Sequence, residues 1–348
     1  MKIRRLRLRA EAVPHSKDHC GDIETGNHGM LDNIGLLIQA PLLNVQLLLD
    51  GIFVGAIFAL AAYGLALVWG VMNVKNLAQG DFVITGGYLA WWLSQPRHVE
   101  IGIPGTEITL IDWVTPVIHP ILSMPLVIVV MFGFGWLVYV AVIRRVIGKD
   151  LFTSLLATFG LALVMAQLLN LMFGPEVQVA ESGFEIHSLG GLVTVATIKF
   201  VSLCLAAVLA AIVVVFMKYS RMGQAIRATA QDPRAAKVMG VDTDRVYAFT
   251  FSLNSAICGA AGVLISMIWV IQPFFGIAHS IRSFVIVTAA GLGNLPGVIM
   301  AGLGLGVAEF YAGFTFGAEL QQFTVVGMLV AVLVWRQIQY SRHRQAVQ

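Results

Sequence analysis

The chain has 348 residues, of which 58% are hydrophobic and only 12% are charged. Soluble globular proteins average about 45–50% apolar and about 25% charged residues, so this composition excludes a soluble single-core enzyme, a disordered chain and a collagen-like chain. The formal net charge of +3 is too small to indicate binding to nucleic acid. The composition therefore predicts an all-α polytopic membrane protein surrounded by a lipid bilayer.

Residues 1–40 have the composition of a flexible N-terminal extension. The basic stretch Ile3–Arg9 is not followed by an apolar core, so it does not form a secretory signal. Met30 is a second candidate for the first residue of the native chain. We expect a membrane domain over residues 41–340 and a short cytoplasmic tail over residues 341–348.

About eight hydrophobic segments approach the length of about 20 apolar residues that a helix needs to cross a bilayer. Six lack Lys, Arg, Asp and Glu: Ile52–Val71, Ile121–Ile143, Leu151–Phe173, Phe200–Met217, Val246–Ile271 and Ser283–Ala308. Two shorter runs are Phe82–Leu93 and Phe323–Trp335, and the second extends to Tyr340 if Arg336 reaches the membrane surface. The GxxxG pairs Gly51/Gly55, Gly293/Gly297 and Gly302/Gly306 predict closely packed helices.

Two of these segments are predicted to be interrupted or re-entrant, one in each half of the chain. Met72–Leu93 opens with amide and charged residues, and Ser283–Gly297 ends in glycine and proline. Non-helical backbone is tolerated at membrane depth only where protein or a water-filled cavity covers it. Paired interruptions indicate a transport pathway between repeats, whereas two kinked structural helices would leave the same pattern. The predicted pathway residues are Asn76, Gln79, Gly80, Asp81, Gly291, Gly293, Asn294, Pro296 and Gly297.

The distribution of basic residues predicts the orientation, because Lys and Arg concentrate in cytoplasmic loops. Residues 1–49, 144–150, 218–245 and the tail after Trp335 hold 18 of the 22 basic residues. We therefore expect both termini in the cytoplasm. Segments 94–120 and 174–199 are richer in acidic residues and are expected outside. The second of these, the external loop, contains β-branched and alternating runs such as Val177–Ala180 that favour short strands or a hairpin.

The cytoplasmic loop over residues 218–245 contains clear helix-boundary signals. Asp232 and Pro233 predict a helix start, and Gly240 can end a short helix in the left-handed conformation. Asp242 can then cap the helix that returns to the membrane. A short helix on this face is suited to docking in a cleft of another protein. A solvated basic loop that only sets topology is the alternative.

Patterns for catalysis or cofactor binding are missing from the sequence. The chain lacks GxxxxGK[ST], HExxH and GxSxG, so we expect no ATPase site of its own, no enzyme activity, no metal and no cofactor. Its three cysteines lie too far apart to indicate a disulfide framework. Asp50, Asp81 and Glu309 fall at segment ends, so intramembrane acids for a proton relay are nearly missing. An external energy source is therefore favoured.

Three regions carry a family resemblance. They are Tyr219–Asp242, Asn76–Asp81, and Gly291–Gly297 followed by Gly304–Glu309. Together they resemble the branched-chain amino acid ABC transporter permeases of the LivH type, in order along most of the chain. The chain departs from that pattern at Leu77 and Gln79, at Ala290, and at its C-terminus from Trp335 onward.

The resemblance implies a permease subunit that imports branched-chain or similar amino acids across the bacterial inner (plasma) membrane. It implies as partners two cytoplasmic ABC ATPase subunits, a second homologous permease and an extracytoplasmic substrate-binding protein. It also implies that the short cytoplasmic helix couples to an ATPase. The coupling residues would be Arg227, Asp232, Pro233, Ala235, Ala236 and Gly240.

Two alternative functions stay open. Urea and short-amide importers resemble the same permease type. A stand-alone channel for small neutral solutes would need no partner, and passive flux through the chain alone would favour it.

Overall fold

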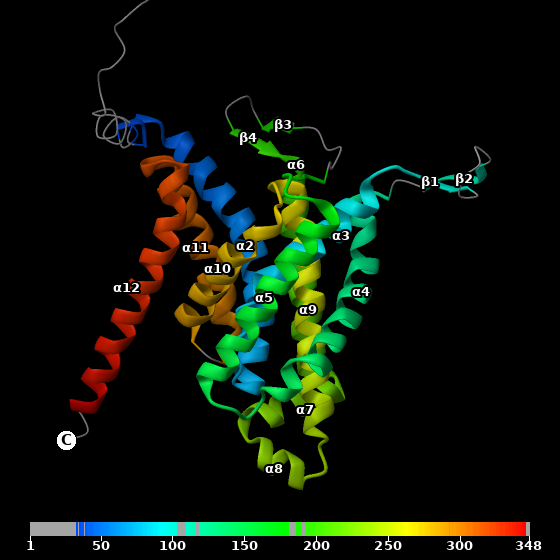
Figure 1. Ribbon diagram of the computed structural model, residues 1–348. Helices are drawn as coiled ribbons and strands as arrows, with labels where there is room; N and C mark the ends of the chain where they lie inside the picture. Colours follow the sequence, from blue (N-terminus) through cyan, green and yellow to red (C-terminus); the bar gives the residue numbers. More distant parts are fainter. Residues whose placement is uncertain are drawn as a thin grey trace, which may run out of the picture.

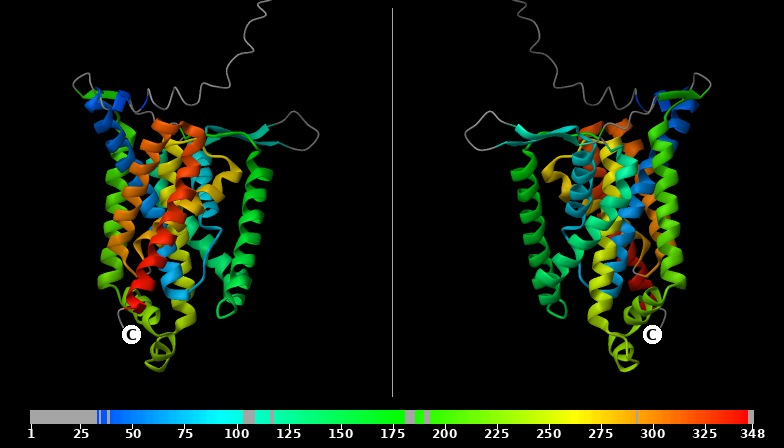
Figure 2. Two further views of the ribbon diagram at one scale, coloured as in Figure 1. Left: turned by 90° about the vertical axis from the view of Figure 1, so that its left-hand side faces the viewer. Right: turned by 90° about the vertical axis from the view of Figure 1, so that its right-hand side faces the viewer.

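The computed structural model describes residues 33, 35–37, 39–102, 109–115, 118–180, 186–189, 193–291 and 293–345. Within them the helices stand side by side as a bundle (Figures 1 and 2). Among the described residues, eight helical segments are long and apolar enough to cross a membrane, which confirms the predicted polytopic helical fold. The helices are α2 (Pro41–Met72), α3 (Gln79–Ser94), α4 (Pro120–Ala141), α5 (Leu151–Phe173), α6 (Thr197–Tyr219), α7 (Arg221–Gln231), α8 (Pro233–Val238), α9 (Thr243–Ile268), α10 (Gly276–Ala290), α11 (Leu295–Phe316) and α12 (Ala318–Gln345).

Two small antiparallel hairpins lie at one end of the bundle, and α7 and α8 lie at the other (Figure 1). Strand β1 (Arg97–Gly102) pairs with β2 (Thr109–Thr115), and β3 (Ile186–Leu189) pairs with β4 (Val193–Ala196). The second hairpin confirms the strands predicted in the external loop, whereas the first was not anticipated. We call these two ends the strand side and the α8 side.

The predicted strand at Val177–Ala180 pairs with the chain that follows α9 instead of joining the hairpin. Gln178 and Ile271 exchange backbone hydrogen bonds of 2.9 and 2.7 Å, and the Ala180 amide donates to the Ser266 carbonyl at 2.9 Å. The external loop is therefore tied directly to the end of α9.

The placement of the two termini corrects one expectation. Helix α2 begins on the strand side, while α12 ends on the α8 side (Figure 1), so Pro41 and the end of α12 cannot share one face of a membrane. The six basic residues of the N-terminal region all lie 24 or more residues before Pro41. Charge sets topology only within about 15–20 residues of a spanning segment, so counting those residues was wrong. The extension itself, residues 1–32, lies outside the described residues.

The two halves of the bundle repeat one pattern in opposite directions (Figure 1). In the first half the long helix α2 is followed by a non-helical stretch, residues 73–78, and by the short helix α3 of 16 residues. In the second half α9 is followed by residues 269–275, which include the 3₁₀ turn η2 (Pro273–Phe275), and by α10 of 15 residues. Helices α4 and α5 follow in the first half and α11 and α12 in the second, while α6 lies between the two sets in the chain. Helix α2 packs along α11, and α9 packs along α4. This arrangement is that of an inverted repeat.

The two interruptions predicted from the sequence are present, but the second is of another kind. Residues 291, 293 and 294 lie in the turn between α10 and α11, so the apolar run Ser283–Ala308 belongs to two helices. The counterpart of residues 73–78 is the stretch 269–275. It was missed because the apolar run of α9 continues through Ile271 without a break.

Glycines bring the central helices into direct contact. Cβ atoms on Gly51 and Gly55 of α2 would collide with the backbone of α11 at Val307 and Gly302, so two of the predicted GxxxG pairs face each other. Gly293 has open space around it and lies in a turn, so the third pair does not join helices. In α2 and α9, 89% of the most apolar window is buried. These two helices form the core around which the others pack.

Candidate functional site

A cluster of fully buried amide side chains lies where the non-helical stretch 73–78 meets α3. Gln79 donates from Nε2 to the Asn254 Oδ1 atom at 2.9 Å and receives a bond from Asn254 Nδ2 at 3.0 Å. Gln79 also donates to the Ala61 carbonyl at 2.9 Å. Asn76 donates from Nδ2 to the Gln79 Oε1 atom at 3.4 Å, and its Oδ1 atom accepts from the Ala78 amide at 3.2 Å. The cluster therefore joins α2, α3 and α9 through groups that have no access to solvent.

Two hydroxyl groups hold the non-helical stretch itself. Thr158 of α5 accepts from the Leu77 amide at 3.3 Å and donates to the Lys75 carbonyl at 3.1 Å. Ser280 of α10 donates to the Leu77 carbonyl at 2.7 Å and accepts from the Gly80 amide at 2.8 Å. Since unpaired backbone groups at membrane depth are costly, these contacts explain how the chain leaves the helical path here.

The starts of the two short helices α3 and α10 cross in close contact. A Cβ atom on Gly80 would overlap the Gly276 carbonyl and lie 2.6 Å from the Ser280 amide nitrogen, and one on Gly276 would overlap the Asp81 carboxylate. Asp81 is 1% exposed, and its Oδ2 atom has no hydrogen-bond partner among the described residues. The structure thus brings Asn76, Gln79, Gly80 and Asp81 together in one closed, tightly packed region.

The predicted pathway residues of the second half lie elsewhere. Gly291 and Gly293 take positive φ values of 89° and 82° in the turn after α10. Asn294 is exposed and caps α11 by accepting from the Gly297 amide at 3.1 Å, and Pro296 follows as an exposed first-turn residue. These residues do not meet the Asn76–Asp81 region, and their assignment to a pathway stays a prediction.

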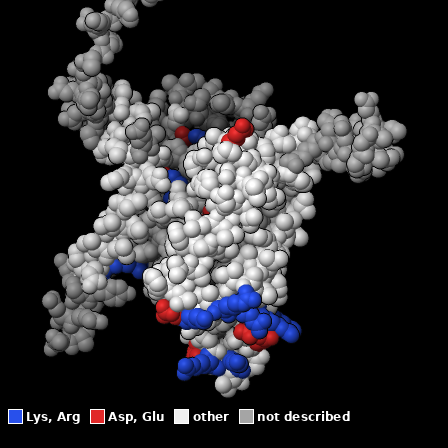
Figure 3. Space-filling model, viewed as in Figure 1, with Lys and Arg blue, Asp and Glu red and all other residues white. Residues whose placement is uncertain are grey.

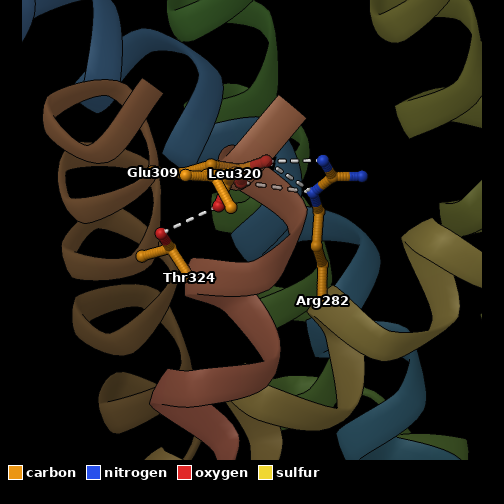
Figure 4. Close-up of polar contacts among 4 residues, drawn as sticks. All are labelled: Arg282, Glu309, Leu320 and Thr324. Atoms are coloured by element: carbon orange, nitrogen blue, oxygen red, sulfur yellow. Dashed lines mark hydrogen bonds and ion pairs between the residues drawn. The ribbon is translucent and has the colours of Figure 1, made fainter. Parts of the chain in front are cut away.

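A buried ion pair joins α10 to α11 (Figure 4). Arg282 donates from Nε to both Glu309 carboxylate oxygens at 3.0 and 3.2 Å, and from Nη2 to Oε1 at 2.5 Å. The side chains are 13% and 1% exposed. On the neighbouring turn of α12 the Thr324 hydroxyl bonds to the Leu320 carbonyl at 3.2 Å, so among the residues drawn only Arg282 bonds to Glu309.

This pair corrects the expectation that acidic residues lie only at segment ends. Glu309 lies well inside α11, and Arg282 lies in the middle of α10. The apolar run used for the prediction begins at Ser283, which placed Arg282 at a membrane boundary. An ionisable residue within a spanning helix is itself a signal for a functional site, and it could have found Arg282.

Two cavities lie between α10 and α12, one toward each end of the bundle. The strand-side cavity, of about 360 Å³, is lined by Trp269, Val270, Phe274, Phe275, Ile277, Ala278, His279, Arg282, Gln321 and Gln322. The α8-side cavity, of about 590 Å³, is lined by Trp69, Lys75, Leu77, Ile281, Phe284, Val287, Thr288, Leu329, Leu333, Arg336 and Gln337. The first interruption therefore contributes Lys75 and Leu77 to a cavity, while its amide side chains point into the core.

The predicted cytoplasmic helix forms as expected. Asp232 accepts from the amides of Arg234 and Ala235 at 2.8 and 3.1 Å, Pro233 occupies the first turn, and Gly240 follows with φ +87°. Asp242 then caps α9 by accepting from the Arg245 amide at 3.2 Å. The local signals in this loop were therefore sufficient to predict its geometry.

The residues predicted to couple to an ATPase fall into two groups in the structure. Asp232, Pro233, Ala235, Ala236 and Gly240 build or end α8, and Ala236 is 5% exposed at its base. Arg227 instead donates back to the Met217 and Lys218 carbonyls, which fastens α7 to the end of α6. Val238 and Met239 are 86% and 83% exposed at the tip of the loop, and sequence reasoning did not single them out.

Charged side chains gather around the α8 side. Figure 3 shows Lys and Arg concentrated at that end of the molecule, with Asp and Glu among them. This agrees with the expectation that residues 144–150 and 218–245 share the cytoplasmic face. The hairpins lie at the opposite end (Figure 1), as expected for external segments.

Comparison with known proteins shows which family the sequence resembles. Residues 47–333 match the family described as branched-chain amino acid transport system / permease component. The chain is 26% identical over 296 residues to the high-affinity branched-chain amino acid transport system permease protein LivH of Escherichia coli (strain K12), covering 83% of this chain and 92% of LivH. It is 25% identical over 302 residues to the corresponding permease protein BraD of Pseudomonas aeruginosa, covering 84% and 94%. No solved structure matches the chain.

Proposed function

Because the chain belongs to the family of permease components of branched-chain amino acid transport systems, we propose that it is the membrane-spanning permease subunit of an ABC importer. It is a multi-pass transport permease of the bacterial cell membrane, and in this role it moves branched-chain or similar amino acids inward. Two cytoplasmic ABC ATPase subunits supply ATP hydrolysis, and a second homologous permease completes the membrane part. An extracytoplasmic substrate-binding protein delivers the solute on the strand side.

The observation that carries this proposal is α8. The helix is capped at both ends and projects from the bundle (Figure 1). Val238 and Met239 present large apolar side chains at its tip, where contact with water is unfavourable and a cleft in a partner would cover them. A short capped helix joined directly to α9 can transmit movement of an ATPase to the bundle, whereas a channel that works alone has no use for it.

The solute is proposed to pass along the face of α10 that carries the two cavities. Asn76, Gln79, Gly80 and Asp81 act there by shaping the stretch 73–78, from which Lys75 and Leu77 reach the α8-side cavity. The turn over Gly291, Gly293, Asn294, Pro296 and Gly297 lets α10 and α11 reverse direction at the end of this face.

Transport in proteoliposomes tests the proposal. Three preparations are compared for uptake of labelled leucine and of labelled urea: the chain alone, the chain with the second permease and ATPases encoded beside it, and that assembly with the binding protein and ATP. We expect ATP-dependent leucine uptake only in the last. Sustained flux through the chain alone would instead establish a channel, and uptake of urea without leucine would establish a short-amide importer.

Docking of the ATPases is tested by Gly240→Trp. Gly240 follows α8 with φ +87°, a conformation that costs a residue with a Cβ atom about 1 kcal/mol or more, so α8 should be displaced while the membrane helices still insert. We expect the ATPases to be lost when the chain is purified. Gly148→Trp is the matched control, because Gly148 also has a positive φ and open space around it but lies in the other cytoplasmic loop. Normal recovery of the ATPases with Gly240→Trp contradicts the role of α8.

A further inference from the structure

The guanidinium of Arg282 is held in one fixed position. Glu309 receives three of its N–H···O contacts, as described above. The guanidinium carbon lies 5.2 Å from the centre of the Phe58 ring and 5.7 Å from that of Trp269, so two aromatic rings also attract the cation. A cation restrained in this way loses little further side-chain freedom when it binds a ligand.

One nitrogen of this guanidinium remains available. Nη1 has no hydrogen-bond partner among the described residues, and Figure 4 shows the third nitrogen of the group pointing away from Glu309. Arg282 lines the strand-side cavity, and no acidic residue stands among the described residues of its lining. A partly buried N–H group without an acceptor favours a ligand that carries an anionic oxygen.

The remaining lining residues define the kind of ligand that fits. Trp269, Phe274, Phe275 and Ile277 provide apolar walls, and Gln321 provides an amide from the first turns of α12. The volume of about 360 Å³ is within the range of small-molecule sites. An aliphatic side chain and one polar end group would both find partners.

The charge of the Arg282–Glu309 pair restricts the class of ligand further. Glu309 already neutralises Arg282, so a simple carboxylate bound at Nη1 would leave a net negative charge in a partly buried place, which is unfavourable. A zwitterion brings its own ammonium group and leaves no net charge. The site therefore favours an α-amino acid over a simple carboxylic acid or a neutral amide.

We propose that the strand-side cavity binds an apolar α-amino acid during entry, with the solute carboxylate bonded to Arg282 Nη1 and the side chain against Trp269 and Phe274. This inference deepens the proposed function and rests on it. Glu309 acts as a positioning residue that holds the guanidinium. Binding is weak, because a solute in transit must also leave.

Equilibrium binding to the purified full-length chain in lipid nanodiscs tests the site. The probes are L-leucine, L-leucinamide, which lacks the carboxylate, and 4-methylpentanoate, which lacks the ammonium group. We expect leucine to bind about tenfold or more tightly than either analogue. The double variant Arg282→Gln/Glu309→Gln, which leaves no unpaired buried charge, should bind leucine and leucinamide equally. Arg245→Gln, at an exposed position on the α8 side, should keep the preference.

The ratio of the leucine affinity to the leucinamide affinity separates recognition of the carboxylate from a structural effect. A purely structural change would weaken the binding of both ligands alike. If the double variant does not fold, Arg282→Lys keeps the charge but replaces the forked donor, and it should lower the leucine preference. A preference retained in either folded variant, or no leucine binding by the unaltered chain, overturns the inference. The proposed function would still stand if the full assembly imports leucine. Conversely, leucine bound through Arg282 without import by the assembly would refute the proposed function alone.

Discussion

Gln79 and Asn254 exchange hydrogen bonds in both directions inside the bundle, with both side chains fully buried. Replacing either one by Leu leaves the other amide without this partner. Hydrogen bonds between membrane helices contribute about 0.6 kcal/mol on average and about 1.7 at most, so we expect each single variant to lose about 1 kcal/mol of stability. The stability lost in the double variant should be smaller than the sum of the losses in the two single variants. A double-mutant cycle built from thermal unfolding in detergent measures this difference.

The same variants separate two roles of Gln79. If it only shapes the stretch 73–78, transport should fall in proportion to stability. If transport is lost while the unfolding temperature is unchanged, the side chain itself meets the solute. Arg245→Gln is the control, since Arg245 is exposed and lies outside the predicted pathway.

Gly80 allows α3 to approach α10 more closely than any other residue would. A Cβ atom there would overlap backbone atoms of Gly276 and Ser280, which cannot move aside as a flexible side chain can. We expect Gly80→Ala to lower the yield of folded protein and its unfolding temperature. Gly304→Ala is the matched control, because Gly304 lies in α11 with open space around it. Alanine favours a helix by about 1 kcal/mol over glycine, so this variant should be neutral or stabilised.

At the scale of elements, α8 depends on one side chain for its first turn. The Asp232 carboxylate accepts from two backbone amides, Arg234 and Ala235. Loss of such a cap costs about 1 kcal/mol, a large fraction for a helix of six residues. Asp232→Ala should therefore speed hydrogen exchange of the amides in α8 while leaving α9 unchanged. Asp244→Ala, a first-turn residue of α9 that caps nothing there, should not affect exchange in α8, and equal exchange in both variants would contradict the role of the cap.

The elements that could be predicted from the sequence are those set by local signals. Asp232, Pro233, Gly240 and Asp242 each act on their own neighbours, and the structure places α8 where they indicate. The non-helical path of Trp269–Ile271 could not be recognised, because these residues are apolar and continue the run that begins at Val246. The segment is non-helical because Gln178 pairs with Ile271, a partner 93 positions away that no local pattern reveals.

The candidate site shows the same limit. Asn76 and Gln79 were found because they lie within a few residues of each other in one polar motif. Arg282 and Glu309 lie on different helices, 27 positions apart, and Gln79 meets Asn254 across 175 positions. Such contacts form only when the helices pack, so composition and residue spacing do not predict them.

At the scale of the whole molecule, α9 connects α8 to the non-helical stretch 73–78. Asp242 begins α9 next to α8, and Asn254 lies 12 positions further along, about 18 Å at 1.5 Å per residue. Asn254 bonds directly to Gln79, which begins α3. A shift of α8 along the axis of α9 would therefore reach the stretch 73–78 through the contact between the Asn254 and Gln79 side chains.

The opposed ends of the bundle lead to the last prediction, which concerns topology. Helix α3 with residues 73–78 adds one crossing to the eight spanning segments, and an odd number of crossings puts the start of α2 and the end of α12 on opposite faces. Single cysteines at Leu42, Val177 and Val238, all exposed, are placed in a chain whose three native cysteines are replaced. An impermeant maleimide added to intact spheroplasts should label Leu42→Cys and Val177→Cys. Only inverted vesicles should label Val238→Cys.

Leu264→Cys, fully buried in α9, reports that the bundle stays folded and should stay unlabelled in both preparations. If Leu42→Cys and Val238→Cys are labelled in the same preparation, the start of α2 and the loop that carries α8 lie on one face of the membrane. Residues 73–94 would then not form a crossing. Since that crossing positions Gln79 against Asn254, the result would also remove the connection from α8 to the interrupted stretch. If Leu42→Cys is labelled together with Val177→Cys instead, the proposed substrate-binding protein and the proposed ATPases face opposite ends of one continuous bundle.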